Sequence, residues 1–158
     1  MARKDITMSP AEIDAFLAAP RNMALATLGA DGFPHVAPMW YVMRDGAIVF
    51  RSFTKSQKMV NLKRDPRLTV LAESGDAYSQ LKGVMIKGEA QLNDDHDFVL
   101  DVYVELATRY PMAESITGTA DKESLRAAYA GFAAKNTAVT VIPSKTISWD
   151  HTKLGAAY

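Results

Sequence analysis

The stretch RSFTKSQKMVNLKRDPR, residues 51–67, gathers six basic residues and a single acidic one. The whole chain of 158 residues carries eighteen of each kind, so its formal net charge is zero and seventeen acidic residues face twelve basic ones outside this stretch. A basic segment in a neutral chain indicates a local site for a compact anion. The same balance argues against a protein that coats nucleic acid through a general positive field.

The spacing of residues in this stretch predicts a turn between a strand and a helix. Thr54 and Gln57 match a capping box, so we expect a helix that begins near Lys55 and ends before Pro66. The N–H groups of its first turn would lack internal partners and lie at the positive end of the helix dipole, where they attract phosphate or carboxylate. Three further side chains could complete this pocket: Ser52, Ser56 and Lys58.

Lys55, Lys58 and Asn61 follow one another at intervals of three, which places them on one side of the expected helix. One anionic group could therefore contact all three. In the alternative interpretation, Met59 and Leu62 pack inward and the lysines are only solvated. We expect the other basic residues of the helix and its end to be solvated: Lys63, Arg64 and Arg67.

Other kinds of site find little support in the sequence. The chain has no cysteine, which excludes disulfides, thiolate metal ligands and a cysteine nucleophile. The three histidines are far apart and have no paired spacing, so we expect no metal site. Three acidic residues precede a helical pattern and are interpreted as charges at a helix N-terminus: Asp94, Asp95 and Asp97.

Short β-type runs dominate the order of the elements. A first helix is expected from Pro10, with Ser9 and Glu12 as a capping box, and it should end at Pro20. Two further helical patterns cover residues 94–110 and 121–134. The strand-like runs are residues 22–28, 33–43, 47–53, 67–73, 81–92, 137–143 and 145–151. This order favours a closed antiparallel barrel with helical insertions over a doubly wound parallel sheet.

The run over residues 33–43 has two features that bear on a binding site. Pro34 and Pro38 lie four residues apart, which suits an edge strand, a bulge or the opening of a barrel. Trp40 and Tyr41 alternate between faces, so one can be buried while the other lines a pocket.

No repeat or linker divides the chain, so we expect one domain over residues 1–158. The sequence contains neither the apolar run of a membrane span nor the pattern of an N-terminal signal peptide. A soluble cytoplasmic protein that binds neither nucleic acid nor membrane is therefore expected.

Taken together, several motifs resemble the flavin split-barrel superfamily that includes pyridoxamine 5′-phosphate oxidase, and most closely its deazaflavin-dependent reductase branch. The residues that carry the resemblance are Asp31-Gly32, Pro34-His35, Pro38, Trp40, Ser52, Ser56, Lys58-x-x-Asn61-Leu62, Asp65-Pro66-Arg67 and the terminal SWDHTKL. The resemblance implies a mainly β fold with α insertions, a six-stranded antiparallel split β-barrel. It also implies a homodimer with two cofactor sites at the subunit interface.

The resemblance further implies that the cofactor phosphate lies near residues 52–58, with the C-terminal segment close to the neighbouring subunit's cofactor. Coenzyme F-420 is the expected cofactor, and FMN is the alternative. The residues expected to bind it are Pro38, Met39, Trp40, Arg51, Ser52, Lys55, Ser56, Lys58, Asn61 and Trp149. No catalytic side chain is expected, because the coenzyme ring carries the hydride.

The expected function is an F-420-dependent oxidoreductase that transfers a hydride from the reduced coenzyme to a small conjugated acceptor. Two alternatives stay open. One is an FMN-dependent oxidase or reductase of the pyridoxamine phosphate oxidase type, and the other is a non-catalytic protein that binds a flavin or a tetrapyrrole.

Overall fold

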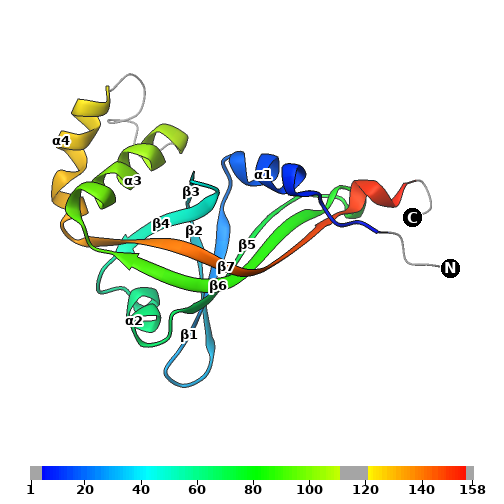
Figure 1. Cartoon of the computed structure of the whole chain (residues 1–158), viewed down its shortest axis with the longest axis horizontal. Coiled ribbons are helices and arrows are strands. Elements are labelled where there is room, and N and C mark those ends of the chain that lie inside the picture. Colours follow the sequence, from blue (N-terminus) through cyan, green and yellow to red (C-terminus); the bar gives the residue numbers. More distant parts are fainter. Residues whose placement is uncertain (1–4, 111–120, 156–158) are drawn as a thin grey trace.

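Seven β-strands form one antiparallel sheet in the computed structural model, which describes residues 5–110 and 121–155 (Figure 1). Their hydrogen-bonded order is β2-β1-β5-β6-β7-β4-β3. The strands are β1 (Met23–Leu28), β2 (Pro34–Met39), β3 (Val42–Arg44), β4 (Ala47–Phe53), β5 (Arg67–Ser74), β6 (Lys82–Asn93) and β7 (Asn136–Asp150). The helices are α1 (Pro10–Ala18), α2 (Gln57–Arg64), α3 (His96–Arg109) and α4 (Lys122–Ala133), with short 3-10 helices η1 (Tyr78–Gln80) and η2 (His151–Leu154).

The antiparallel, mainly β fold with helical insertions is confirmed, but six is the wrong number of strands. The run expected as one strand over residues 33–43 is divided into β2 and β3, which pair with β1 and β4 respectively. The two runs expected over residues 137–151 instead form the single strand β7. A bulge at Ser144, opposite the step from Lys87 to Gly88 in β6, lets that strand continue. Gly88 allows it because a Cβ there would lie 2.2 Å from the Ile142 carbonyl oxygen.

The sheet is strongly curled, because its two edges are joined by a very short connection. Only Trp40 and Tyr41 separate β2 from β3, yet these strands are the opposite edges of the sheet. Three Cα steps limit the gap between Met39 and Val42 to about 11 Å. Within the described residues no ladder joins the two edges, so the expected closed barrel is not confirmed. The prolines of β2 lie in an edge strand, which is one of the three settings that their spacing suited.

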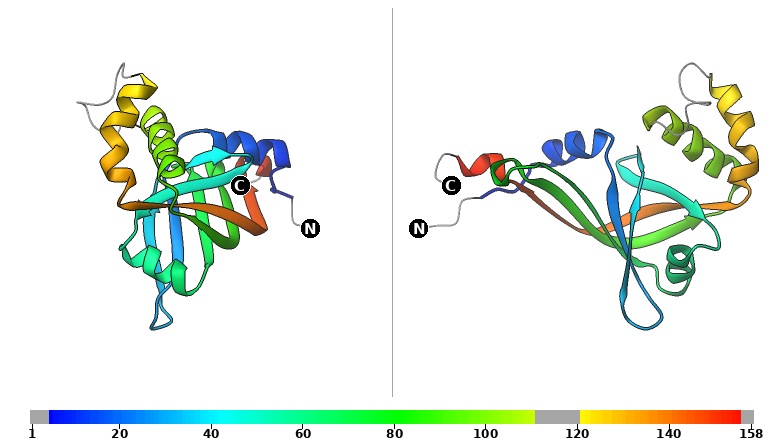
Figure 2. Two further views of the ribbon diagram at one scale, coloured as in Figure 1. Left: turned by 60° about the vertical axis from the view of Figure 1, so that its left-hand side comes forward. Right: turned by 180° about the vertical axis from the view of Figure 1, so that it is seen from behind.

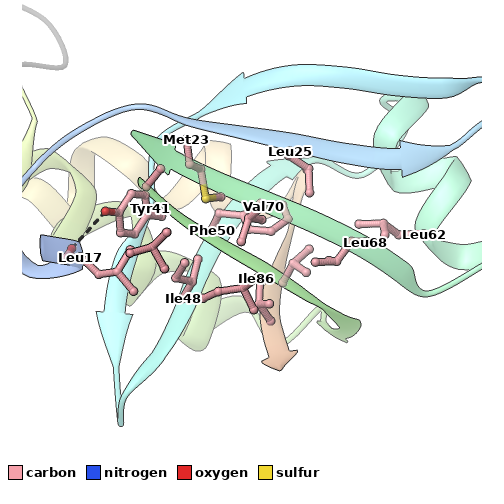
Figure 3. Close-up of a cluster of buried hydrophobic side chains, with 14 of the residues drawn as sticks. Leu17, Met23, Leu25, Tyr41, Ile48, Phe50, Leu62, Leu68, Val70 and Ile86 are labelled. Atoms are coloured by element: carbon pink, nitrogen blue, oxygen red, sulfur yellow. Dashed lines mark hydrogen bonds between the residues drawn. The ribbon is translucent and has the colours of Figure 1, made fainter. Parts of the chain in front are cut away.

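The main hydrophobic core lies inside the curl of the sheet. Figure 3 shows its side chains, which come from different strands and point toward one another. The core includes Met23, Leu25, Ile48, Phe50, Val70 and Ile86. Leu17 of α1 joins this core, and the buried Tyr41 hydroxyl donates a hydrogen bond to the Leu17 carbonyl oxygen (3.1 Å). The capping box of Ser9 and Glu12 is present, so α1 begins as its sequence predicted.

A second core lies where α3 and α4 cover one end of the sheet (Figure 2). Val102 and Leu106 of α3 and Tyr129 of α4 pack with Val49 of β4, which confirms the helical periodicity read from the sequence. Asp95 caps α3 by accepting a hydrogen bond from the Phe98 N–H group (2.8 Å). The cluster of acidic residues therefore begins a helix, as expected. No helix in the described part of the chain is long and apolar enough to cross a membrane.

Candidate functional site: a cavity beside a basic turn

A cavity of about 390 Å³ lies between the end of β2, strand β4 and helix α3. Its lining residues are Asn22, Pro38, Met39, Trp40, Arg51 and Leu106. Four of the residues expected to bind the cofactor therefore meet in one hollow, although Pro38 and Arg51 come from strands at different places in the sheet. The short connection between β2 and β3 brings them together, because it holds one edge of the sheet against the other.

Aromatic packing fixes the position of Trp40 in this wall. Its indole ring stacks on the Tyr110 ring, with 4.8 Å between the centroids and 5° between the planes. The Tyr110 hydroxyl lies 3.0 Å from the Arg21 carbonyl oxygen and 3.1 Å from that of Tyr41, so it can donate its one proton to either. Tyr41, the residue after Trp40, is fully buried in the core, whereas Trp40 lines the cavity. Trp40 is thus placed before any ligand binds.

Arg51 brings a positive charge into the same cavity. Its guanidinium carbon lies 4.0 Å from the centroid of the Tyr103 ring, and that ring stacks on Tyr129 of α4. The Arg51 Nε is buried without a hydrogen-bond partner, and no carboxylate pairs with this side chain among the described residues. Burial lowers the pKa of the guanidinium. A desolvated cation without a counter-charge favours the entry of an anion.

The turn between β4 and α2 supplies a second place for an anion. The Ser52 hydroxyl lies 3.1 Å from that of Ser56, and Ser52 is only 5% exposed. Ser56 occupies the N-cap of α2 but makes no side-chain capping bond. The Met59 N–H group donates to the Ser56 carbonyl oxygen (3.0 Å), but the first two N–H groups of the helix, those of Gln57 and Lys58, have no intrahelical acceptor and remain able to bind a phosphate or carboxylate.

The expected capping box at this turn is wrong. Helix α2 begins at Gln57, two residues after Lys55, and its N-cap is Ser56 and not Thr54. The Thr54 hydroxyl instead lies 3.0 Å from the Thr137 hydroxyl on β7. Thr54 is therefore held by a neighbouring strand, and a contact distant in sequence has replaced the local one. The predicted end of the helix before Pro66 is confirmed.

Lys58 and Lys55 have different environments at this turn. Lys58 is half-buried in the first turn of α2, and burial lowers its pKa. Lys55 is exposed and precedes the helix, so the two lysines do not share one helix side as expected. Asn61 is fully buried, accepts a hydrogen bond from Gln57 Nε2 (2.9 Å) and donates one to the Thr27 hydroxyl (3.0 Å). Asn61 thus ties α2 to β1, and its contact with a cofactor stays a prediction.

Arg64 and Arg67, the last two basic residues of the stretch, form hydrogen bonds or an ion pair with nearby groups of the protein. The Arg67 guanidinium forms an ion pair with Asp65 at 2.6 Å, and this pairing lowers the pKa of the Asp65 carboxyl group to about 2. Arg64 donates a hydrogen bond to the Leu28 carbonyl oxygen. Both side chains are exposed, as expected for solvated basic residues, although Arg67 also borders a separate hollow between β1, β5 and β6.

The cavity and the anion-binding turn lie on opposite faces of β4. Ser52 follows Arg51 directly in the strand, and successive strand residues point to opposite faces. Strand β3 pairs with β4 only as far as Val49, so within the described chain the end of β4 has one edge free of a strand partner. A long ligand could pass across this edge, with a ring in the cavity and an anionic group at the turn.

Trp149 lies away from the other expected residues within one chain. It belongs to the end of β7, next to η2, which Figure 1 places at the opposite end of the molecule from α3 and α4. Its ring lies over Gly83, where a Cβ would come within 2.1 Å of the indole. Trp149 lines a separate hollow with Ile147 and His151.

Sequence reasoning missed four residues that build the cavity or support it: Asn22, Tyr103, Leu106 and Tyr110. Asn22 precedes a strand, and no local pattern distinguishes it. The other three belong to the helical pattern over residues 94–110, whose periodicity predicted only that this helix has a buried face. Which strand residues it would cover depends on the order of strands in the sheet.

The curled antiparallel sheet and the basic turn together define a protein of the flavin split-barrel superfamily. The chain belongs to the pyridoxamine 5′-phosphate oxidase family, whose model matches residues 9–141. This confirms the resemblance seen in the sequence. None of the curated proteins compared with the chain matches it.

Solved structures of several other proteins have the same fold. A conserved hypothetical protein from Mycobacterium tuberculosis is 39% identical, with a TM-score of 0.86 over 100% of this chain and 94% of that one. An F-420 reductase is 21% identical, with a TM-score of 0.64 over 85% of this chain and 94% of its own. An FAD-binding protein from Mesorhizobium loti is 22% identical, with a TM-score of 0.65 over 90% and 94%.

Proposed function

We propose that this protein is an oxidoreductase that uses coenzyme F-420 to reduce a small conjugated acceptor. The observation that carries the proposal is the meeting of Pro38, Met39, Trp40 and Arg51 in one cavity beside the basic turn. One of the solved structures with this fold is an F-420 reductase, which supports the choice of coenzyme.

In this proposal the turn between β4 and α2 holds the coenzyme phosphate. The hydroxyls of Ser52 and Ser56 lie 3.1 Å apart, so both could donate to one phosphate group. Lys58 contributes the positive charge, and the free N–H groups at the start of α2 contribute further donors. The exposed Lys55 lies where it could meet an anionic tail that extends into solvent.

The cavity would receive the coenzyme ring and the acceptor. When bound, the reduced deazaflavin ring supplies the hydride. The side chains of Pro38, Met39 and Leu106 offer apolar surface that excludes water, and Trp40 offers a flat aromatic wall held in place by Tyr110. The contribution of the chain is thus to place two flat molecules against each other and not to supply a nucleophile.

The alternative is FMN, whose tricyclic ring and phosphate have the same general shape. The FAD-binding protein with this fold favours a true flavin as the second candidate. A paired titration of the apo-protein with F-420 and with FMN, followed by tryptophan fluorescence at moderate salt, separates the two. We expect tight binding of F-420 and weaker binding of FMN, because only F-420 has a tail that can reach the exposed basic residues. The reverse order would assign FMN, and binding of neither would refute a flavin-type cofactor.

We also propose that the protein is a homodimer. Five side chains that face away from the main core form a row across five neighbouring strands, each directly opposite the next: Pro38, Ala24, Leu71, Met85 and Ile147. All five are at least partly exposed, and an apolar row of this extent favours an interface. Pro38 also lines the cavity, and Trp149 lies two residues beyond Ile147. A second copy of the chain packed over this row would therefore border both the cavity at Pro38 and the hollow at Trp149.

Sedimentation equilibrium should give twice the mass of one chain. Leu71→Arg, at the centre of the row, should shift the protein to monomer because the interface would have to bury an unpaired charge. Phe132→Arg provides the matched control, since Phe132 is 57% exposed on α4 and lies outside the row. A monomeric wild-type protein, or a dimer that Leu71→Arg leaves intact, would contradict this interface.

A further inference from the structure

Among the residues that the structure describes, Arg51 is the one charged side chain that lines the cavity. Pro38, Met39 and Leu106 are apolar, and the other polar groups there are the amide of Asn22 and the indole N–H of Trp40. Among the described residues the Arg51 guanidinium has no carboxylate partner, and its Nε makes no hydrogen bond. A buried cation in apolar surroundings is costly unless a counter-charge accompanies it. The cavity therefore lacks one negative charge.

The guanidinium is held in place by two helices far away in the sequence. The Tyr103 ring of α3 lies beneath it at 4.0 Å, which is a favourable cation–π distance. Tyr129 of α4 stacks on Tyr103, with 5.2 Å between ring centroids and 20° between their planes. An arginine fixed in this way loses little freedom when a ligand binds, so it can act as a preorganised donor.

The phosphate of the coenzyme has a separate site of its own. Ser52, Ser56 and Lys58 are gathered at the turn, whereas Arg51 points to the other face of β4 against Tyr103. A single guanidinium matches a group with one negative charge, and its planar fork fits the two oxygens of a carboxylate. The apolar walls suit a flat hydrocarbon framework attached to that group.

We propose that the acceptor is a planar conjugated molecule with a carboxylate group and that Arg51 binds this carboxylate in the cavity. This inference rests on the proposed function, because it takes the cavity as the place of the acceptor. It goes further in assigning a substrate class and a residue that selects it. A neutral acceptor of the same shape would leave the Arg51 charge without a partner.

The test compares 2-naphthoate with 2-naphthamide, which share one ring system but differ in charge. Calorimetric titration of the full-length protein should show at least about 10-fold tighter binding of the acid, because a charge-assisted pair replaces a neutral contact. In Arg51→Met this preference should disappear. Arg67→Met is the matched control and should keep it, since Arg67 is paired with Asp65 outside the cavity.

Arg51→Lys gives a second variant that keeps the charge but lacks the planar fork, and it should retain only part of the preference. Circular dichroism checks that each variant is folded. Equal binding of acid and amide by the wild type, or a preference that survives in Arg51→Met, would overturn the proposal. If Arg51→Met instead weakened binding of complete F-420 but not of the same deazaflavin without its tail, the carboxylate would belong to the coenzyme and the acceptor assignment would fall.

The two proposals fail in distinguishable ways. Tight F-420 binding without a preference for naphthoate would refute the carboxylate subsite alone. A clear preference for naphthoate in a protein that binds neither F-420 nor FMN would refute the proposed coenzyme and leave Arg51 as a carboxylate site.

Discussion

Lys58→Ala should weaken coenzyme binding by about 10-fold to 150-fold, which corresponds to the roughly 1.5–3 kcal/mol of a charge-assisted hydrogen bond. Lys58 is half-buried in the first turn of α2, two residues after Ser56, and no side chain caps the N–H groups of that turn. Its charge therefore acts where water screens it less than at an exposed surface. Titration of wild-type and variant apo-protein with F-420, read by tryptophan fluorescence, measures the change.

Lys122→Ala is the matched control for this substitution. Lys122 is also a lysine in the first turn of a helix, but it is exposed on α4 and belongs to no part of the site. Its removal should change the affinity by less than about 2-fold, as expected for an exposed charge. An unchanged affinity in Lys58→Ala, or an equal loss in both variants, would remove Lys58 from the phosphate site.

The pH dependence of binding supplies an independent check on Lys58. Burial lowers the pKa of this lysine below its ordinary value of 10.5. The lysine must carry its charge to bind phosphate, so affinity for the coenzyme should fall as the pH rises toward that value and should begin to fall earlier than an exposed lysine would predict. This decline should be absent in Lys58→Ala.

Local patterns in the sequence were sufficient to predict how several elements begin and where they lie. Ser9 with Glu12 begins α1, Asp95 caps α3, and the prolines of β2 mark an edge strand. Each of these predictions depends on a contact within three residues or on a property of the backbone itself. The basic turn was identified for the same reason, because its serines and Lys58 are neighbours in the sequence.

Predictions failed where a distant contact replaced a local one. Thr54 could have capped a helix, but its hydroxyl pairs with Thr137, which lies 83 residues further along the chain. Residues 33–43 read as one strand, but the chain leaves β2 at Trp40 and buries Tyr41 in the core before β3 begins. Both outcomes depend on which strands become neighbours, and periodicity does not contain that information.

The cavity shows the same limit. Pro38, Trp40 and Arg51 could be singled out from the resemblance, but the ring beneath Arg51 comes from α3 and the ring behind Trp40 from the residue that follows this helix. In the sequence, Tyr103 and Tyr110 belong to a helical pattern and its end, with nothing to relate them to either partner. The side chains that hold the lining residues in place are therefore harder to predict than the lining residues themselves, because tertiary packing determines which of them come into contact.

Tyr110→Ala should be among the most destabilising single substitutions at the site, with a cost of about 3–5 kcal/mol in the free energy of unfolding. Tyr110 is only 6% exposed, and its ring stacks on Trp40. Its hydroxyl also shares its one proton between the carbonyl oxygens of Arg21 and Tyr41, which would be left without this donor. Urea denaturation followed by circular dichroism, at one fixed protein concentration, measures the change.

Two further variants separate the contributions of the ring and the hydroxyl. Tyr110→Phe keeps the stack on Trp40 and loses the hydroxyl contacts with the two carbonyl oxygens and with Arg109 Nε (3.3 Å), so it should cost about 1–3 kcal/mol. Phe33→Ala is the control, because this aromatic side chain is 73% exposed and its loss should change stability by no more than about 0.5 kcal/mol. If Tyr110→Ala cost no more than Tyr110→Phe, the stack would contribute nothing to stability. Trp40 would then owe its position in the cavity wall to the short connection between β2 and β3 alone.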